Sequence, residues 1–130
     1  MTSRRILILD CTPTYEPSEG QLLKHFFKIC QLKKPEKASS LYYKITSKRA
    51  FLNKLGSPKK WDIVHISAHG LADRQDVIIG NGSSWKVTPD EIRVFSHLRA
   101  KLVFANACLN NRRAMAAAFE GSDYFLAPNT

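Results

Sequence analysis

The order of apolar and amphipathic segments in this chain predicts an α/β fold, with a mostly parallel sheet and helices on both faces. Short apolar runs alternate with amphipathic stretches, which is the pattern of strand–helix units. The first run, RILILDC at residues 5–11, is continuously apolar, as expected for a strand that is buried on both sides. The length of 130 residues fits one domain, residues 1–130.

The first half of the chain continues with a helix, a strand and a second helix. Apolar residues of 18–32 recur at helical spacing, in the stretch SEGQLLKHFFKICQL. Residues 41–45, LYYKI, have strand composition. Residues 46–56 read as a short helix, with Thr46 or Ser47 as its N-cap.

The second half repeats this alternation and inserts a hairpin. Two short β-type runs within 76–87 flank the glycine-rich turn 80–82, which is typical of a hairpin. Thr88, Pro89 and Glu91 form the N-cap, first position and capping box of a helix. The predicted elements of this half are strand 62–70, hairpin 76–87, helix 88–98, strand 101–108, helix 111–121 and strand 123–128.

The formal net charge of +9 comes from one segment. Residues 22–60 contain eleven Lys or Arg and a single acid, Glu36, whereas the remainder is close to neutral. A basic surface attracts nucleic acid, anionic lipid or an acidic protein. Polyanion or nucleic-acid binding through 22–60 is therefore one hypothesis, and a solvated lysine-rich surface is the alternative.

Neither membrane insertion nor a disulfide framework is predicted. No apolar run approaches ~18 residues, and the ILIL block is too short for a signal peptide, so we expect a cytoplasmic protein without membrane contact. Cys11, Cys30 and Cys108 are odd in number and lack CxxC spacing, which argues against disulfides and structural zinc. We expect Cys11 and Cys30 to be small buried hydrophobes, and no cofactor or metal is predicted.

Reactive side chains follow three predicted strands. Sites in open parallel sheets lie at the carboxyl ends of strands, and Asp10, His69 and Cys108 occupy such positions. If the strands of His69 and Cys108 are neighbours, about 4.8 Å apart, the imidazole and the thiol converge. His65 lies inside its strand and is interpreted as a core residue or as one that supports the neighbouring site residues, so an HxxxH zinc pair is disfavoured. His25 and His97 are expected on helices, either at the surface or at its boundary with the core.

Motifs in residues 60–128 resemble those of the caspase-like (clan CD) cysteine peptidases. The similar features are DIVHISAHG, then a short hairpin with a glycine-rich turn, then TPDEI, then LVFANACLN. The resemblance is closest to the CHAT branch, shared with separase and more distantly with caspases, metacaspases and gingipains. It implies a three-layer caspase-like fold with a small hairpin between the His and Cys strands.

The resemblance also assigns roles. It implies a cysteine endopeptidase acting on a protein or peptide, in which Cys108 is the nucleophile and forms a thioester acyl-enzyme. His69 would protonate the leaving amine. The backbone N–H groups of Gly70 and Cys108 would form the oxyanion hole. A helix that begins just after Cys108 would lower the pKa of its thiol.

The sequence departs from the family pattern at the specificity position. Some relatives that cut after Arg or Lys carry an acidic residue near the nucleophile strand, and KLVFANAC has none. Asp10 and Asp73 are the substrate-binding candidates that could replace it.

The second departure concerns the end of the chain. Relatives continue beyond DYFLAPNT with a strand and a helix, so we expect a fragment, one subunit of a processed enzyme, or a degenerate protein completed by a partner. An edge strand at 123–128 would recruit a partner or a second copy. A catalytically weak or inactive interaction module with this fold is the alternative to an enzyme.

Overall fold

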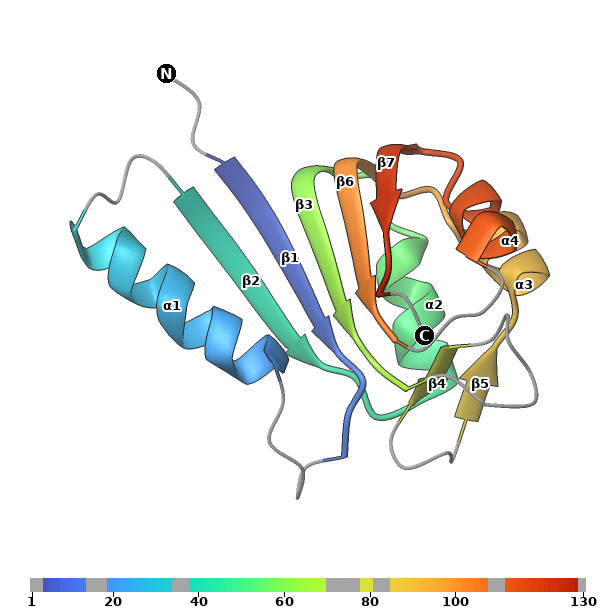
Figure 1. The fold of residues 1–130 in the computed structure, drawn as a ribbon, viewed down its shortest axis with the longest axis horizontal. Helices are drawn as coiled ribbons and strands as arrows, with labels where there is room; N and C mark the ends of the chain where they lie inside the picture. The colour runs from blue at the N-terminus through green and yellow to red at the C-terminus, as the bar shows by residue number, and fades with distance from the viewer. Residues whose placement is uncertain are drawn as a thin grey trace.

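A five-stranded parallel sheet organises the chain (Figure 1). The computed structural model describes residues 4–13, 19–33, 38–69, 78–80, 85–107 and 112–128. The strands stand in the order β2-β1-β3-β6-β7, and each neighbouring pair is parallel. The predicted α/β class with a mostly parallel sheet is confirmed.

The described elements follow the predicted order. They are β1 Arg4–Asp10, α1 Glu19–Lys33, β2 Ala38–Lys44, α2 Lys48–Leu55, β3 Lys60–Ser67, β4 Ile78–Gly80, β5 Trp85–Val87, α3 Pro89–Phe95, β6 Arg99–Asn106, α4 Arg112–Ala118 and β7 Ser122–Leu126. β2 begins before the predicted residue 41, because Ala38 pairs with Arg4 and pairing outweighs the weak strand preference of its first residues. None of the helices in these ranges is long and apolar enough to cross a membrane.

Local side-chain contacts explain where the helices on one side begin and how the hairpin closes. The Ser47 hydroxyl accepts a hydrogen bond from the Ala50 N–H at 3.1 Å, which makes Ser47 the N-cap of α2. The predicted capping box of Thr88 and Glu91 at α3 is present. In the antiparallel hairpin β4–β5, a Cβ on Gly80 would lie 2.0 Å from the Trp85 ring, so only glycine fits there.

The α2 face of the sheet holds the main core. Successive side chains of a strand point to opposite faces, and this face is formed by Leu9, Val64, Ile66, Val103 and Ala105, all fully buried. Their partners in the core cluster come from α2, α3, α4 and the residue after α4, namely Phe51, Leu55, Ile92, Met115, Ala118 and Phe119. The three helices therefore cover this face across most of its width.

The opposite face, the α1 face, is covered only in part by the described helices. Helix α1 contacts β1, β2 and β3 and runs along β2 (Figure 1). Ile8 of β1 is fully buried, whereas Tyr124 and Leu126 of β7 are 73% and 53% exposed. Helices thus lie on both sides of the sheet, as predicted, but within the described ranges none covers β6 and β7 on the α1 face.

Candidate functional site

The two strands that lead to the predicted dyad are neighbours. β3 and β6 pair in parallel, and Ser67 stands opposite Asn106 in their last pair. Just beyond it, the Ala68 N–H donates to the Asn106 carbonyl at 3.2 Å. His69 and Cys108 each follow that pair by two residues in the sequence. The two strands are therefore neighbours, which is the condition for the predicted approach of His69 to Cys108.

His69 is the one residue of the predicted catalytic set that the structure describes. It directly follows the buried Ala68 and is itself exposed, so its imidazole is open to solvent at the carboxyl end of β3. Cys108, Gly70 and Asp73 lie outside the described residues. The predicted approach of the imidazole to the thiol therefore stays a prediction.

Cys11 is unsuited to nucleophilic chemistry. It is fully buried at the end of β1, and its N–H donates to the Ser67 carbonyl at 2.8 Å. Burial, with a smaller contribution from Asp10, raises the pKa of its thiol far above neutrality. The predicted role of Cys11 as a small buried hydrophobe is confirmed. Cys30 lies in α1, and its side chain is outside what the structure describes.

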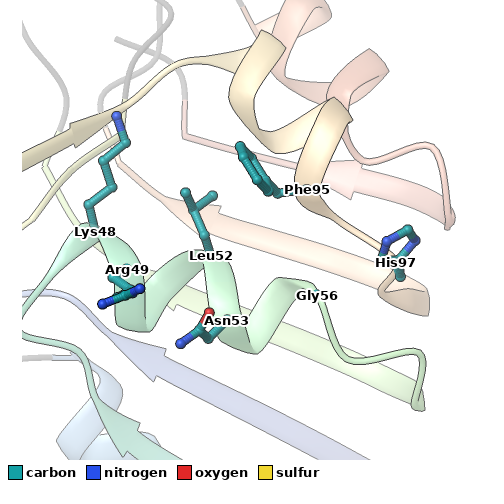
Figure 2. A pocket seen from close by; sticks show the side chains of 7 residues that line it. All are labelled: Lys48, Arg49, Leu52, Asn53, Gly56, Phe95 and His97. Atoms are coloured by element: carbon teal, nitrogen blue, oxygen red, sulfur yellow. The ribbon is translucent and has the colours of Figure 1, made fainter.

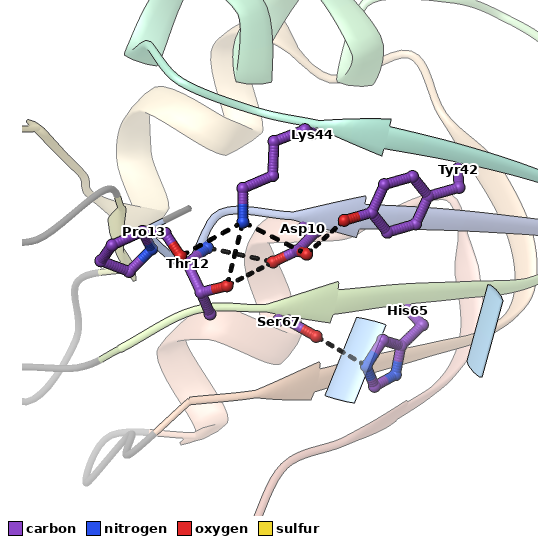
Figure 3. Close-up of polar contacts among 7 residues, drawn as sticks. All are labelled: Asp10, Thr12, Pro13, Tyr42, Lys44, His65 and Ser67. Carbon is purple, nitrogen blue, oxygen red and sulfur yellow. Dashed lines mark hydrogen bonds and ion pairs between the residues drawn. The ribbon is translucent and has the colours of Figure 1, made fainter. Parts of the chain in front are cut away.

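Asp10 forms the centre of a polar cluster at the carboxyl ends of β1 and β2 (Figure 3). Its carboxylate is fully buried. One oxygen accepts hydrogen bonds from the Thr12 N–H at 3.1 Å and the Thr12 hydroxyl at 2.6 Å. The other accepts one from the Tyr42 hydroxyl at 2.5 Å and lies 3.4 Å from the Lys44 ammonium group. The carboxylate is therefore paired and hydrogen-bonded within the chain.

The start of α1 closes over this cluster. A Cβ on Gly20 would lie 3.2 Å from both the Asp10 Cβ and the Ser67 hydroxyl, so α1 approaches the sheet closely at this point. Sequence reasoning missed Thr12, Tyr42 and Lys44 as partners of Asp10. The alternation of Tyr42 and Lys44 along β2 was a usable signal, but it required the knowledge that β2 pairs with β1 in register.

His65 is a core residue, as predicted. It is buried, its Nε2 lies 3.0 Å from the Ser67 hydroxyl, and its ring stacks on Phe104 at 5.3 Å. Burial lowers its pKa to about 4, so the imidazole is neutral at pH 7. In the part of the chain that the structure describes, no group of three or more His, Cys, Asp or Glu residues could hold a metal ion.

The other two histidines are both exposed. His25 lies on α1, as expected. The placement of His97 on a helix was wrong, because α3 ends at Phe95 and Ser96 takes an extended conformation. His97 instead begins the approach to β6, and its N–H donates to the Leu55 carbonyl at 2.8 Å.

Several cations of residues 22–60 already have partners. Lys44 pairs with Asp10 and Lys48 with Glu91, while Lys24 and Lys54 lie over the rings of Tyr42 and Tyr43. A groove of about 800 Å³ between α2 and α3 has Lys48, Arg49 and His97 around the apolar Leu52 and Phe95 (Figure 2). Neither Asp10 nor His69, the two predicted site residues that the structure describes, lines it. Polyanion binding through 22–60 stays a prediction.

Comparison with protein-family models, with curated proteins and with solved structures found no match for this chain. The functional argument therefore rests on the residues and on their placement in the sheet.

Proposed function

We propose that this chain is a caspase-like cysteine endopeptidase domain, or the portion of one that bears the nucleophile. The parallel pairing of β3 with β6 carries the proposal, because it brings the His69 strand beside the strand that leads to Cys108. The hairpin β4–β5 lies between these strands in the sequence, as the resemblance to CHAT and separase-like peptidases requires. The proposal needs no cofactor, its substrate is a protein or peptide, and it includes a cytoplasmic location.

The proposed reaction is acyl transfer through Cys108. Its sulfur attacks the peptide carbonyl carbon, and the thiol proton passes to His69. His69 then returns a proton to the leaving amine as the C–N bond breaks, which leaves a thioester. Water cleaves the thioester and releases the carboxylate product with the free thiol. The N–H groups of Gly70 and Cys108 would stabilise the oxyanion of each tetrahedral intermediate.

The specificity of this proposed enzyme has two acidic candidates with different standing. The Asp10 carboxylate is buried and already paired with Lys44, so a substrate Lys or Arg would have to displace Lys44 to reach it. We therefore assign Asp10 to holding the ends of β1 and β2 together. If the enzyme cuts after basic residues, Asp73 is the remaining candidate of the two, and Asp73→Asn should then lower kcat/KM for those substrates selectively.

The decisive experiment compares variants of the predicted dyad in a peptide-library cleavage assay. Cys108→Ala and His69→Ala should each reduce cleavage by about 10³-fold or more, because each removes a group that acts in the chemical step. Cys30→Ala is the matched control and should retain activity. Cleavage that survives Cys108→Ala would refute the proposal.

Thiol reactivity gives a second readout that does not need the natural substrate. Cys108 should alkylate faster than Cys11 under brief iodoacetamide treatment at pH 7, because the Cys11 thiol is buried and its pKa is raised. Mass spectrometry of the native protein measures both sites. Labelling of Cys108 that is no faster than labelling of Cys11 would count against an activated thiol.

An interaction module is the alternative, and the position of β7 favours it. Among the described strands, β7 forms one edge of the sheet, and an edge strand presents backbone groups to which another chain can add a strand. Phe125 and Ala127 of this edge are half-buried, and Phe125 stacks on Phe119 at 5.8 Å. A partner that protects the β7 amides from hydrogen exchange, together with no thiol-dependent cleavage, would support this alternative over the enzyme.

A further inference from the structure

Helix α1 turns a stripe of large apolar side chains away from the sheet. Leu22, Phe26, Ile29 and Leu32 follow helical spacing, and each is more than half exposed. The sheet-facing side is marked by Gly20 against Asp10 and by Lys24, whose ammonium group lies 4.8 Å from the Tyr42 ring centroid. The stripe therefore lies on the outer side of α1. Four adjacent exposed residues of this size are unusual on a free surface.

The uncovered half of the α1 face is a second apolar surface on the same side of the molecule. Register places Leu102 opposite Tyr124, and Phe104 opposite Leu126. Burial on this face declines from Ile8 in β1, which is fully buried, through the half-buried Phe104 in β6 to the exposed Leu126 in β7. α1 lies over one half of the face, and the other half has no cover from the described elements.

We propose that a second copy of the chain covers both surfaces in a two-fold symmetric dimer. A two-fold axis parallel to the strands, placed above the middle of the α1 face, exchanges the covered half with the open half. The stripe of each α1 then packs on β6 and β7 of the other copy. The pattern is self-complementary and closes on itself, which distinguishes a symmetric dimer from an open chain of contacts.

The available area fits this occupant. The six most exposed apolar side chains of the two surfaces, Leu22, Phe26, Ile29, Leu32, Tyr124 and Leu126, offer roughly 800 Å² per copy, which is what one partner buries in a standard interface. Because the axis is parallel to the strands, both copies keep their strand carboxyl ends, and hence both His69 residues, at the same end of the dimer.

Charge gives this dimer a salt dependence of known sign. Each copy carries a formal net charge of +9, so two copies repel each other and added salt screens that repulsion. Dimerisation should therefore strengthen with salt. A basic apolar helix could also bind an anionic bilayer, but salt would weaken that contact. The direction of the salt effect separates the two occupants.

Sedimentation equilibrium of the full chain tests the dimer. The wild type should approach twice the chain mass of 14.7 kDa with increasing concentration. Phe26→Glu on α1 and Tyr124→Lys on β7 should each raise the dimer dissociation constant by roughly 100-fold, because each places an unpaired charge in an apolar contact. Val94→Glu is the matched control, since Val94 is 70% exposed on α3, away from both surfaces. Circular dichroism checks that each variant is folded.

Mixing the two disruptive variants makes the test specific to the proposed geometry. In a heterodimer of Phe26→Glu with Tyr124→Lys, both new charges fall in one of the two equivalent contacts, and the other contact keeps its wild-type residues. The mixture should therefore dimerise at least 10-fold more tightly than either variant alone, an effect that an unpaired buried charge cannot give. A dimer that pairs through the β7 edge would be unaffected by Phe26→Glu.

Several results would overturn the inference. A wild type that stays monomeric at high concentration and high salt excludes the dimer, and binding to anionic vesicles by that monomer would assign the stripe to lipid instead. A dimer that persists in Phe26→Glu, or one that Val94→Glu weakens equally, has a different interface. Failure of the mixture to recover dimerisation would also reject this symmetry.

Discussion

Different interactions hold the two faces of the sheet against their neighbours. On the α2 face, residues such as Ile66 and Val103 are fully buried under three helices, and the contacts are almost entirely apolar. On the α1 face, Asp10, His65 and Ser67 are buried beside apolar neighbours, and the burial ends before β7 is reached. Stability should therefore depend on packing at the first face and on polar pairing at the second.

The two faces also differ in where they place charged and exposed apolar side chains. The α2 face contains no buried charged side chain among its described sheet residues, whereas the α1 face holds Asp10 with Lys44 and leaves an apolar surface open. His69 and Cys108 of the predicted dyad follow β3 and β6 in the sequence, and these two strands pair with each other. Substitutions on the two faces should consequently differ in size, in pH dependence and in their effect on association.

The largest expected contrast comes from two isoleucines of β3. Ile66 is fully buried on the α2 face, and Ile63 is half-buried on the α1 face. Ile66→Ala should lower the free energy of unfolding by about 4 kcal/mol, because it removes buried methyl groups and leaves a cavity. Ile63→Ala should cost less, about 2 kcal/mol, because part of its side chain is already in water. Urea denaturation measures both free energies. Equal losses in the two variants would contradict the view that packing stabilises the α2 face more than the α1 face.

Two aspartates provide the next contrast, between a buried and an exposed ion pair. Asp10→Asn should lower the free energy of unfolding by about 3 kcal/mol, because it leaves the Lys44 charge without its partner. Asp62→Asn should lower the free energy of unfolding by less than about 1 kcal/mol. The reason is that Arg4 and Lys101, the ion-pair partners of Asp62, are mostly exposed. Thermal denaturation at pH 7 compares them. A larger loss for Asp62 would show that the Asp10 cluster does not stabilise the strand ends.

Sequence patterns predicted the α2 face far better than the α1 face. Apolar runs, the Thr88 capping box and the hairpin around Gly80 are local signals, and each one has its counterpart in the structure. The pairing of Asp10 with Tyr42 and Lys44 depends on the parallel register of β1 and β2, which neither strand encodes alone.

The same limit applies to the candidate site. The position of His69 at a strand end followed from composition, and its exposure agrees with that position. From the sequence, the pairing of β3 with β6 could be stated only as a condition. The hairpin and the helix α3 that connect these strands do not determine which strands become neighbours in the sheet. The sequence also did not predict which side of α1 is exposed. The helical spacing of Leu22 and Phe26 predicts a buried stripe, whereas both side chains are exposed in the structure.

The pH dependence of stability isolates the buried histidine of the α1 face. The pKa of His65 falls from 6.5 to about 4 in the folded chain. Between these values the unfolded chain binds a proton that the folded chain does not, so the free energy of unfolding falls as pH falls through this window, by up to about 1.4 kcal/mol per pH unit. His65→Gln should flatten this part of the profile, and His25→Gln on the surface should retain it. Denaturation at pH 6.5, 5.5 and 4.5 provides the measurement, and an unchanged slope in His65→Gln would assign the acid sensitivity to other groups.

The smallest expected effect concerns how α1 is attached to the sheet. The Lys24 ammonium group lies 4.8 Å from the Tyr42 ring centroid, and Tyr42 also donates to Asp10. Lys24→Gln removes the cation–π contact and should lower the free energy of unfolding by about 0.5–1 kcal/mol. Lys28→Gln is the matched control on the same helix, because Lys28 is exposed and lies over no aromatic ring of the described residues. It should change stability by less than about 0.3 kcal/mol. Amide hydrogen exchange along α1 gives the sharper reading: protection should fall in Lys24→Gln and stay the same in Lys28→Gln. Equal protection in the two variants would mean that the contact over Tyr42 does not help to hold α1, and that Gly20 and the half-buried side chains of the helix hold it instead.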